Sequence, residues 1–427
     1  MKRLLVIAPY FPPIGVVGAK RPLMLARHLP RHGWTPVVLA ADPAGEPNDP
    51  SLLDAVPPEL VVQRVLRAPF GRGRSRGPAG VTAGPGPSVL GWDPGYFTPF
   101  DRYLWGAPAA IRAADRLAGQ HRVAAVHVCA DPWSGLLVGL AVALRRRLPL
   151  IVDLRDPWSL QRAKMRLSPP PTRALIRATE ARVFRRAARV VLTSDAARDA
   201  YRDAYHGRIP ADRFVRIRNA FDPGLFAPDT AELPGRWTVL HFGHFRRLVP
   251  AEPLLEGFAR FVRGEGLSPE ACRLLLLGSI PAPARERARA LGLDPYLEVR
   301  PPVPYRQSLP QLRAAHVLAL VTTEAMALTV PAKLYDYFAA RRPILAITDQ
   351  PEPGRLVAGS GAGEVASPAD PSAVAAALVR LRARTAAPGG GEISPAAVQP
   401  FSAEAQAQAF AALLDEVASE SGGGGGA

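Results

Sequence analysis

The sequence is poor in cysteine: it has two in 427 residues, Cys129 and Cys272. Because both lie in apolar surroundings and far apart in sequence, they favour neither a disulfide framework nor a metal site, and a reducing cytoplasm is the expected compartment. Long apolar runs are also missing, and without about 18 consecutive apolar residues we expect no membrane-spanning helix. The first apolar run, 4–8, is shorter than the roughly 7–15 residues of a signal-peptide core, so we expect it to be a strand.

Acidic residues are outnumbered, with 37 Asp and Glu against 53 Lys and Arg, which gives a formal charge of +16. Such a charge suits phosphate-bearing ligands, an anionic membrane surface or nucleic acid. No zinc-finger spacing, RNA-recognition signature or basic recognition helix accompanies it, so we expect no nucleic-acid partner. Peripheral contact with the inner membrane face through the basic stretches 71–77, 144–148 and 182–189 stays open, although solvated faces are the commoner meaning of such runs.

Strand-like apolar runs alternate with helical patterns along the chain, which indicates parallel sheets covered by helices. The strands expected in the first half are 3–10, 35–41, 60–66, 124–130, 149–156 and 189–194. The helices expected there are 19–33, 107–119, 135–146 and 170–188. A second alternation has expected strands at 237–243, 273–278, 297–303, 316–322, 342–348 and 363–367. Residues 68–100 are too rich in Gly and Pro for a packed element.

The length and the two alternations predict an α/β chain of two Rossmann-like, doubly wound domains. We expect an N-terminal domain over 1–228, a C-terminal domain over 229–400 and a Gly-rich tail over 419–427. The last helix, about 402–418, is expected to pack back onto the N-terminal domain. Because doubly wound sheets bind ligands at the carboxyl ends of their strands, two such domains predict an interdomain cleft.

Several segments keep their order over nearly the whole chain. In the first half these are APYFPPIGVVGAKRPLMLARHLPRHGWTPVVLA, VDLRDPW, VVLTS and IRNAFDP. In the second half they are HFGHFRR, LLLLGS and VPAKLYDYFAARRPILAI. Together they resemble glycosyltransferases of the GT-B fold, closest to the family-4 type. The resemblance implies transfer of a sugar from a nucleotide-sugar donor, bound mainly by the C-terminal domain, to an acceptor hydroxyl, with retention, no metal and no cofactor.

Two alternatives stay open beside this transferase. One is a nucleotide-sugar epimerase on the same fold, which turns over the donor without an acceptor. The other is a binding protein that keeps the GT-B fold without catalysis. The sequence names neither the sugar and nucleotide nor the acceptor, which we expect among polysaccharides, glycolipids or metabolites.

The segment 329–343 carries the strongest signal for the donor. Pro331 is placed to open a helix, and free backbone amides around Thr329 and Val330 then offer an anion site for a diphosphate. Lys333 and Asp336 lie three residues apart and so share a helical face. An ordinary surface pair of Lys and Asp is the structural alternative.

The resemblance assigns roles to this segment. Asp336 stands where family-4 enzymes usually have a Glu that binds the donor ribose, so we expect it to hold the ribose. The earlier Glu of that motif falls on Leu328, and whether Glu324 replaces it is open. We expect the nucleobase near Pro302–Tyr305, with Val303 as the candidate residue.

The segment HFGHFRR ends a predicted strand at Gly243, where the backbone can approach a ligand closely. Arg246 is expected to be catalytic by stabilising the charge of the leaving diphosphate, and Arg247 to bind the donor. A solvated basic turn is the alternative. In the loop before the first helix, Gly15 and Gly18 are expected to approach the donor, without the GxGxxG spacing of a dinucleotide site.

The remaining candidates belong to the acceptor side. Arg155 and Asp156 follow the strand in VDLRDPW, and we expect both to be catalytic, with Asp156 accepting a proton or binding a sugar hydroxyl. An internal Asp–Arg pair is the alternative. Further acceptor-side candidates are Asp131, Trp133, Trp158, Lys20 and Arg21.

Overall fold

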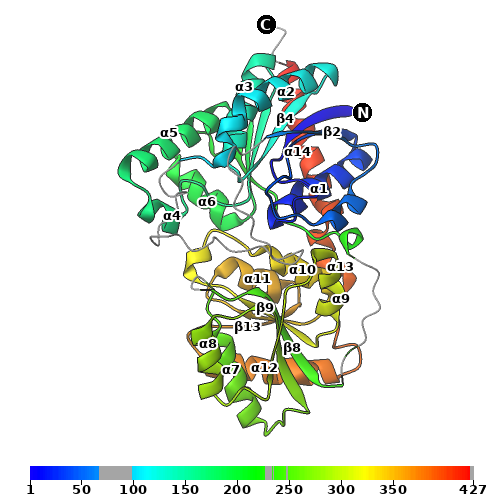
Figure 1. Ribbon diagram of the computed structural model, residues 1–427, viewed down its shortest axis with the longest axis vertical. Coiled ribbons are helices and arrows are strands. Elements are labelled where there is room, and N and C mark those ends of the chain that lie inside the picture. Colours follow the sequence, from blue (N-terminus) through cyan, green and yellow to red (C-terminus); the bar gives the residue numbers. More distant parts are fainter. Residues whose placement is uncertain (67–98, 227–232, 234, 247–248, 424–427) are drawn as a thin grey trace. The chain divides into compact units, whose positions relative to one another are not determined.

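The computed structural model describes residues 1–66, 99–226, 233, 235–246 and 249–423 (Figure 1). The chain forms two compact units: Met1–Asn219 together with Ala403–Ala427, and Ala220–Ser402. The chain therefore leaves the first unit at Asn219, whereas the sequence analysis placed the boundary at residue 228. Most of the expected loop 68–100 lies outside the described residues.

A seven-stranded parallel sheet forms the centre of the first unit, in the order β3-β2-β1-β4-β5-β6-β7. Its strands are β1 (Lys2–Ile7), β2 (Trp34–Ala41), β3 (Val61–Leu66), β4 (Ala125–Ala130), β5 (Leu150–Leu154), β6 (Arg189–Leu192) and β7 (Phe214–Arg216). Its helices are α1 (Lys20–His28), α2 (Ala107–Gln120), α3 (Ser134–Arg146), α4 (Arg162–Leu167), α5 (Pro170–Arg186), α6 (Asp195–Ala204) and α14 (Ala403–Gly423). The predicted parallel sheet is confirmed, and β7 is a short strand that the prediction omitted.

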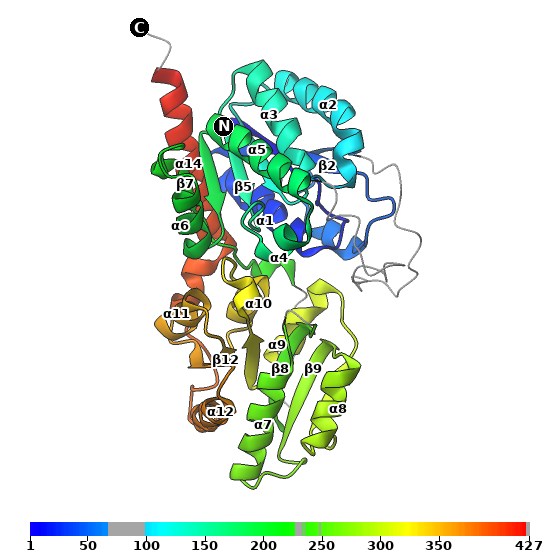
Figure 2. The same cartoon turned by 90° about the vertical axis from the view of Figure 1, so that its left-hand side faces the viewer.

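Helices cover both faces of this sheet. On β4, the side chain of Val128 fills the space beside Gly139 of α3, and the ring of His127 lies 5.3 Å from that of Phe410 on α14. Because successive residues of a strand point to opposite faces, α3 and α14 cover opposite faces of the sheet. Figure 2 shows α14, in red, along one side of the first unit, to which it belongs.

A six-stranded parallel sheet forms the second unit, in the order β10-β9-β8-β11-β12-β13. Its strands are β8 (Trp237–His244), β9 (Cys272–Ser279), β10 (Leu297–Arg300), β11 (Val317–Val321), β12 (Ile344–Ile347) and β13 (Gly363–Ala366). Its helices are α7 (Glu252–Gly264), α8 (Ala282–Ala290), α9 (Ser308–Arg313), α10 (Ala332–Ala340), α11 (Pro351–Gly359), α12 (Pro371–Ala386) and α13 (Pro395–Val398).

The run of four leucines in β9 shows why these strands are continuously apolar. Leu274 and Leu276 pack in a core with Phe258 of α7. Leu275 and Leu277 pack in a second core, on the other face, that includes residues of α9 and α10. A strand that is buried on both faces has no solvent side to alternate with, so every position is apolar.

The strand order of each sheet reverses at its first strand. In the first unit β1 lies between β2 and β4, and in the second unit β8 lies between β9 and β11. In open α/β sheets the ligand site lies at the carboxyl ends of the strands, at such a reversal. This rule directs attention to the residues after β1, β4 and β5, and to the end of β8 at Gly243 and His244.

The ends of β8 and β9 approach each other closely, and we predict that this approach depends on Gly278. Gly278 has φ +151°, and a Cβ on it would lie 2.0 Å from the carbonyl oxygen of Gly243. Gly278→Ala should therefore destabilise the second unit by on the order of 1–3 kcal/mol, measured by urea unfolding of the full chain. Gly264→Ala at the end of α7, where the space is open, is the matched control and should not destabilise. Equal unfolding midpoints for the two variants would contradict the prediction.

Candidate functional site

Gly243, at the carboxyl end of β8, lies under a lysine. Its φ of +111° is in the region that favours glycine, and a Cβ on it would lie 3.0 Å from Nζ of Lys333. Glycine is therefore required here for two reasons: it adopts this positive φ without strain, and it has no side chain to collide with Lys333. The ammonium of Lys333 consequently rests directly against the backbone at the end of the strand.

No carboxylate neutralises this lysine within the part of the chain that the structure describes. Its Nζ lies 3.4 Å from Nε2 of His241, a neighbour without negative charge. Burial and then Arg246 lower the pKa of Lys333 to about 8, against a smaller opposing effect of Asp336. A desolvated cation without a counter-charge is stabilised by any anion that reaches it.

Arg246 adds a second cation beside Lys333. Reciprocal backbone hydrogen bonds with Val249 of 3.0 and 2.7 Å fix its turn, and its side chain is exposed. His244 lies next to it, with Nδ1 2.7 Å from Oγ of Ser279, and burial followed by Lys333 and Arg246 lowers the pKa of His244. The structure thus brings together the predicted donor residues Gly243, Lys333 and Arg246. Arg247 lies outside the described residues.

The start of α10 differs in one detail from the prediction. Pro331 directly precedes the helix, as expected, and its carbonyl accepts a hydrogen bond from the amide of Leu334. The amide of Thr329, however, donates to the carbonyl of Met326 at 2.9 Å, so the prediction of a free amide at Thr329 is wrong. Val330 is buried in the core. The first amides of α10 itself have no partner within the helix and remain the candidate anion donors.

Asp336 lies one turn along α10 and is 4% exposed. Its Oδ1 accepts a hydrogen bond of 2.7 Å from the hydroxyl of Tyr305. Burial and then Asp336 hold the pKa of Tyr305 well above its usual value, so the phenol stays a donor. Val303 is partly buried against the same core.

In the first unit the structure brings Arg155 together with Gly18 and Asp131. The guanidinium of Arg155 lies 2.7–2.9 Å from the place where a Cβ of Gly18 would be. Its Nη2 donates to the carbonyl of Asp131 at 3.2 Å and lies 3.8 Å from the carboxylate. Gly18 therefore leaves room for the guanidinium of Arg155. This guanidinium fills the space beside Gly18 that we expected the donor to approach.

Asp156 follows Arg155 in the sequence, and its carboxylate is half-buried. Its side chain makes no hydrogen bond or ion pair with any residue that the structure describes. The backbone around it is held firmly: Thr193 Oγ1 donates to the carbonyl of Arg155 at 3.1 Å, and the amide of Trp158 donates to the hydroxyl of Tyr201 at 2.8 Å. A rigid loop with an uncommitted carboxylate can accept a proton or a sugar hydroxyl.

The two predicted acceptor-side tryptophans serve the core. The rings of Trp133 and Trp158 stack at 5.0 Å with an interplanar angle of 6°, and Trp158 is fully buried. Phe100 lies against the ring of Trp158 at 5.6 Å. Neither ring is open to a sugar in this structure, which corrects the expectation of an aromatic platform.

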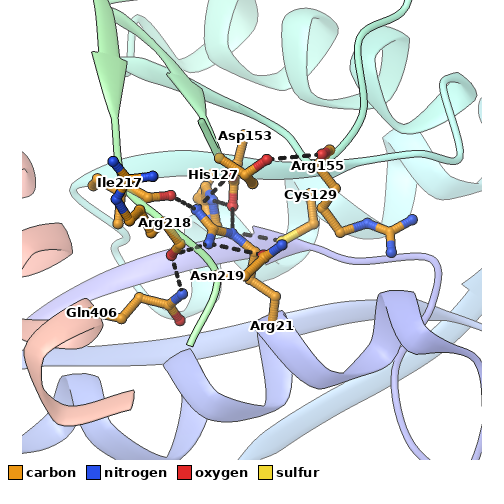
Figure 3. A network of polar contacts seen from close by, with 10 residues as sticks. Arg21, His127, Cys129, Asp153, Arg155, Ile217, Arg218, Asn219 and Gln406 are labelled. Carbon is orange, nitrogen blue, oxygen red and sulfur yellow. Dashed lines mark hydrogen bonds and ion pairs between the residues drawn. The ribbon is translucent and has the colours of Figure 1, made fainter. Parts of the chain in front are cut away.

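Arg21 forms the centre of a buried polar network (Figure 3). Its Nε and Nη2 donate to the two carboxylate oxygens of Asp153 at 2.7 and 3.0 Å, and both side chains are at most 2% exposed. His127 Nε2 lies 3.3 Å from the same carboxylate. The expected acceptor contact of Arg21 is therefore wrong, because its guanidinium is used inside the fold. Lys20 is the first residue of α1 and is half-buried.

The same guanidinium fixes the segment that leaves the first unit. Arg21 donates to the carbonyls of Ile217 and Arg218 at 2.9 and 2.8 Å. Gln406 of α14 donates to the carbonyl of Arg218 as well, at 2.6 Å (Figure 3). Burial alone would raise the pKa of Asp153, but Arg21 and His127 hold it below its usual value. The carboxylate is thus kept ionised as one half of a structural ion pair.

Gly15 is also structural. A Cβ on it would lie 2.8 Å from Cβ of Asp49, and its amide donates to the carbonyl of Pro47 at 2.8 Å. The space beside Gly15 is filled by the loop that contains Asp49, so a side chain would not fit there, and the approach of a donor to Gly15 stays a prediction.

One group of side chains has the composition of a metal site. His127, Cys129 and Asp153 present ligand atoms within 4.8 Å of one another, all buried. Both oxygens of Asp153 already accept hydrogen bonds from Arg21, whose positive charge takes the place that a metal ion would need. We therefore assign this group to the ion-pair network.

Three residues of these sites were missed by the sequence analysis: His241, Ser279 and Tyr201. His241 had a usable signal, since a polar residue inside the apolar strand that ends at Gly243 is unusual. Of the basic stretches, 144–148 and 182–189 present exposed arginines, while 71–77 lies outside the described residues.

Comparison with known proteins agrees with the fold and the motifs. Residues 20–225 match the family model described as Glycosyltransferase Family 4. No protein of curated function matches the chain in sequence.

Solved structures match over nearly the whole chain. Sucrose-phosphate synthase from Thermosynechococcus elongatus is 19% identical with a TM-score of 0.64, and the match covers 98% of this chain and 100% of that one. A glycosyltransferase from Rickettsia africae is 11% identical with a TM-score of 0.62, over 97% and 98%. A putative UDP-N-acetylglucosamine 2-epimerase from Listeria monocytogenes is 14% identical with a TM-score of 0.58, over 98% of both chains.

The chain therefore has the GT-B fold of two Rossmann-like domains, as predicted. The match of residues 20–225 to the family-4 model confirms the resemblance of the motifs. Among the described helices, none has the length and apolar character needed to cross a membrane.

The Arg21–Asp153 pair yields a prediction about stability. Asp153→Asn leaves the buried guanidinium without its counter-charge, which should cost about 3–5 kcal/mol of unfolding free energy. Asp199→Asn, which breaks an exposed pair with Arg198, should cost at most about 1 kcal/mol. Urea unfolding followed by circular dichroism measures both. Similar losses in the two variants would show that the buried pair contributes no more than a surface pair.

Proposed function

We propose that this protein is a glycosyltransferase that moves a hexosyl group from a nucleotide-sugar donor to an acceptor hydroxyl, with retention and without a metal ion. The products we expect are a polysaccharide, a glycolipid or a glycosylated metabolite. The family-4 domain and the GT-B fold support the reaction class. One of the similar structures bears the name of an enzyme of UDP-N-acetylglucosamine, which supports a nucleotide sugar as the substrate.

The observation that carries the proposal is the un-neutralised cation at the end of β8. Lys333 rests on Gly243 without a carboxylate partner among the described residues, and Arg246 lies beside it. Two cations and the first amides of α10 suit the diphosphate of a nucleotide sugar. They also oppose the negative charge that develops on the leaving nucleoside diphosphate, a task that a metal ion performs in other enzymes.

Asp336 is proposed to hold the ribose with the help of Tyr305. The phenol donates to one carboxylate oxygen and so fixes the orientation of the carboxylate that would accept a ribose hydroxyl. An aspartate is one methylene shorter than the glutamate of the family motif. A fixed carboxylate compensates for part of that difference, because less rotamer freedom is lost on binding.

On the acceptor side we propose Asp156 and Arg155. Asp156 offers an uncommitted carboxylate on a rigid loop, and it would accept the proton of the acceptor hydroxyl or orient a sugar hydroxyl. Arg155 lies against Gly18 and Asp131 and would hold the negative charge of Asp156 or of a substrate phosphate.

The donor site predicts nucleotide binding that depends on Lys333. Calorimetry with UDP, GDP, ADP and dTDP in EDTA should find one nucleotide that binds, and Lys333→Met should weaken it roughly ten- to a hundredfold. In the free protein Lys333 is protonated below its pKa of about 8, so wild-type affinity should hold below pH 8 and fall as the pH rises above it. This pH dependence should be absent in Lys333→Met.

Arg285→Met is the matched control for this experiment. Arg285 is an exposed arginine of α8 in the same unit, so its loss removes one positive charge without touching the proposed site. Its affinity should stay within about twofold of wild type. Binding of no nucleotide, or equal losses in the two variants, would exclude the donor site as proposed.

Asp156→Asn separates the transferase from the epimerase. The substitution should lower kcat by a factor of about 10² or more for transfer to an acceptor, and leave nucleotide affinity unchanged, because Asp156 is assigned to the acceptor. Conversion of the donor sugar to its epimer in the absence of any acceptor, followed by NMR, would favour the epimerase instead. Wild-type activity of Asp156→Asn with acceptor would remove Asp156 from the mechanism.

A further inference from the structure

His241 is a fully buried histidine in β8, beneath the ammonium of Lys333. Its Nδ1 lies 2.9 Å from the carbonyl oxygen of Ala319, and a carbonyl can only accept, so Nδ1 carries the proton and donates it. The other nitrogen, Nε2, is then left as an acceptor and faces Nζ of Lys333 at 3.4 Å. Phe245 stacks on the ring at 4.0 Å and prevents it from turning.

Burial and the cations near this pair favour an uncharged imidazole, against a smaller opposing effect of the Ala319 carbonyl. Burial and then Lys333 hold the pKa of His241 well below its usual value. Of the charged groups around the ammonium, Arg246 and His244 follow from β8, and Asp336 lies on α10 with one oxygen bonded to Tyr305. The ammonium therefore donates to a neutral ring.

We infer that His241 is the positioning residue of the diphosphate site: it holds the Lys333 ammonium over Gly243 through a neutral acceptor and so leaves the positive charge for the ligand. The inference rests on the proposed function and adds a residue to the donor site. A carboxylate at this position would hold the lysine equally well. It would also cancel the charge that the diphosphate needs.

Gly243 explains why a positioning residue is required. The glycine opens space above the strand, and a lysine side chain with four rotatable bonds does not stay in open space unless a partner holds it. His241 supplies that partner from below. The hydrogen bond from Nδ1 of His241 to the carbonyl of Ala319, in the neighbouring strand β11, ties the histidine and thereby the lysine to the sheet.

A double-mutant cycle tests this role with the nucleotide that binds wild type among UDP, GDP, ADP and dTDP. His241→Phe keeps a ring to stack on Phe245 but removes the acceptor, and should weaken binding roughly tenfold. His241→Phe combined with Lys333→Met should bind no more weakly than Lys333→Met alone. His241→Gln, which can again accept from the ammonium, should bind within about threefold of wild type.

The outcomes separate this inference from the function beneath it. If Lys333→Met binds as wild type does, or no nucleotide binds, the donor site fails and the inference fails with it. If Lys333→Met weakens binding but the losses in the double variant add, the donor site stands and His241 is only structural. An affinity of His241→Phe equal to that of wild type would likewise overturn the role of His241.

A measurement on the wild-type protein covers the case in which His241→Phe does not fold. Because burial and Arg246 lower the pKa of Lys333 to about 8, this lysine is partly deprotonated at pH 8, and the diphosphate should draw a proton onto it. Calorimetry in buffers of different ionisation enthalpy should therefore detect uptake of a fraction of a proton at pH 8, and none at pH 6.5 beyond that of the nucleotide itself. Absence of uptake at pH 8 would show that the lysine is already neutralised by a counter-charge, and would overturn the inference.

Discussion

The guanidinium of Arg21 lies where four segments of the first unit meet. It comes from α1, it binds Asp153 of β5, and it holds the carbonyls at 217–218 just before the chain leaves the unit. α14, on which the chain returns, adds Gln406 to the same carbonyl as Arg21 and places Phe410 under the guanidinium at 5.1 Å. A buried charge that satisfies so many acceptors cannot move without leaving several of them unpaired. The ion pair therefore fixes the end of β5, from which Arg155 and Asp156 follow directly.

The half-buried ammonium of Lys333 in the second unit is in the opposite situation. Lys333 has a neutral imidazole beneath it and a second cation beside it, within the described part of the chain. Leaving a charge unpaired costs stability, and proteins tolerate that cost where a ligand completes the pairing. The contrast between the site of Arg21 and the site of Lys333 separates structure from function more clearly than sequence motifs do, since both side chains come from the second residue of a helix.

The fold was predictable because the alternation of apolar strands and amphipathic helices is repeated many times along the chain. Strands such as β9 are apolar at every position, and this pattern requires helices on both faces of a parallel sheet. The short strand β7 was not predictable, because three residues are too few to show a periodic pattern of apolar side chains. Gly243, Lys333 and Arg246 were found from a strand end and a helix start, which are local features. The partners of Arg21, Gly15 and Trp158 are set by segments distant in sequence, so local pattern could not reveal that these residues are used inside the fold.

The chemistry of a leaving diphosphate explains why a lysine without a paired carboxylate suits the proposed reaction. A nucleotide sugar gains negative charge on its diphosphate as the bond to the sugar breaks. A cation that is already fully paired would bind substrate and transition state alike, and would lower KM without raising kcat. Lys333 has no carboxylate partner among the described residues, so its positive charge would be available to that growing negative charge. In the proposed reaction its interaction would therefore strengthen as the bond breaks, which is the condition for accelerating the step.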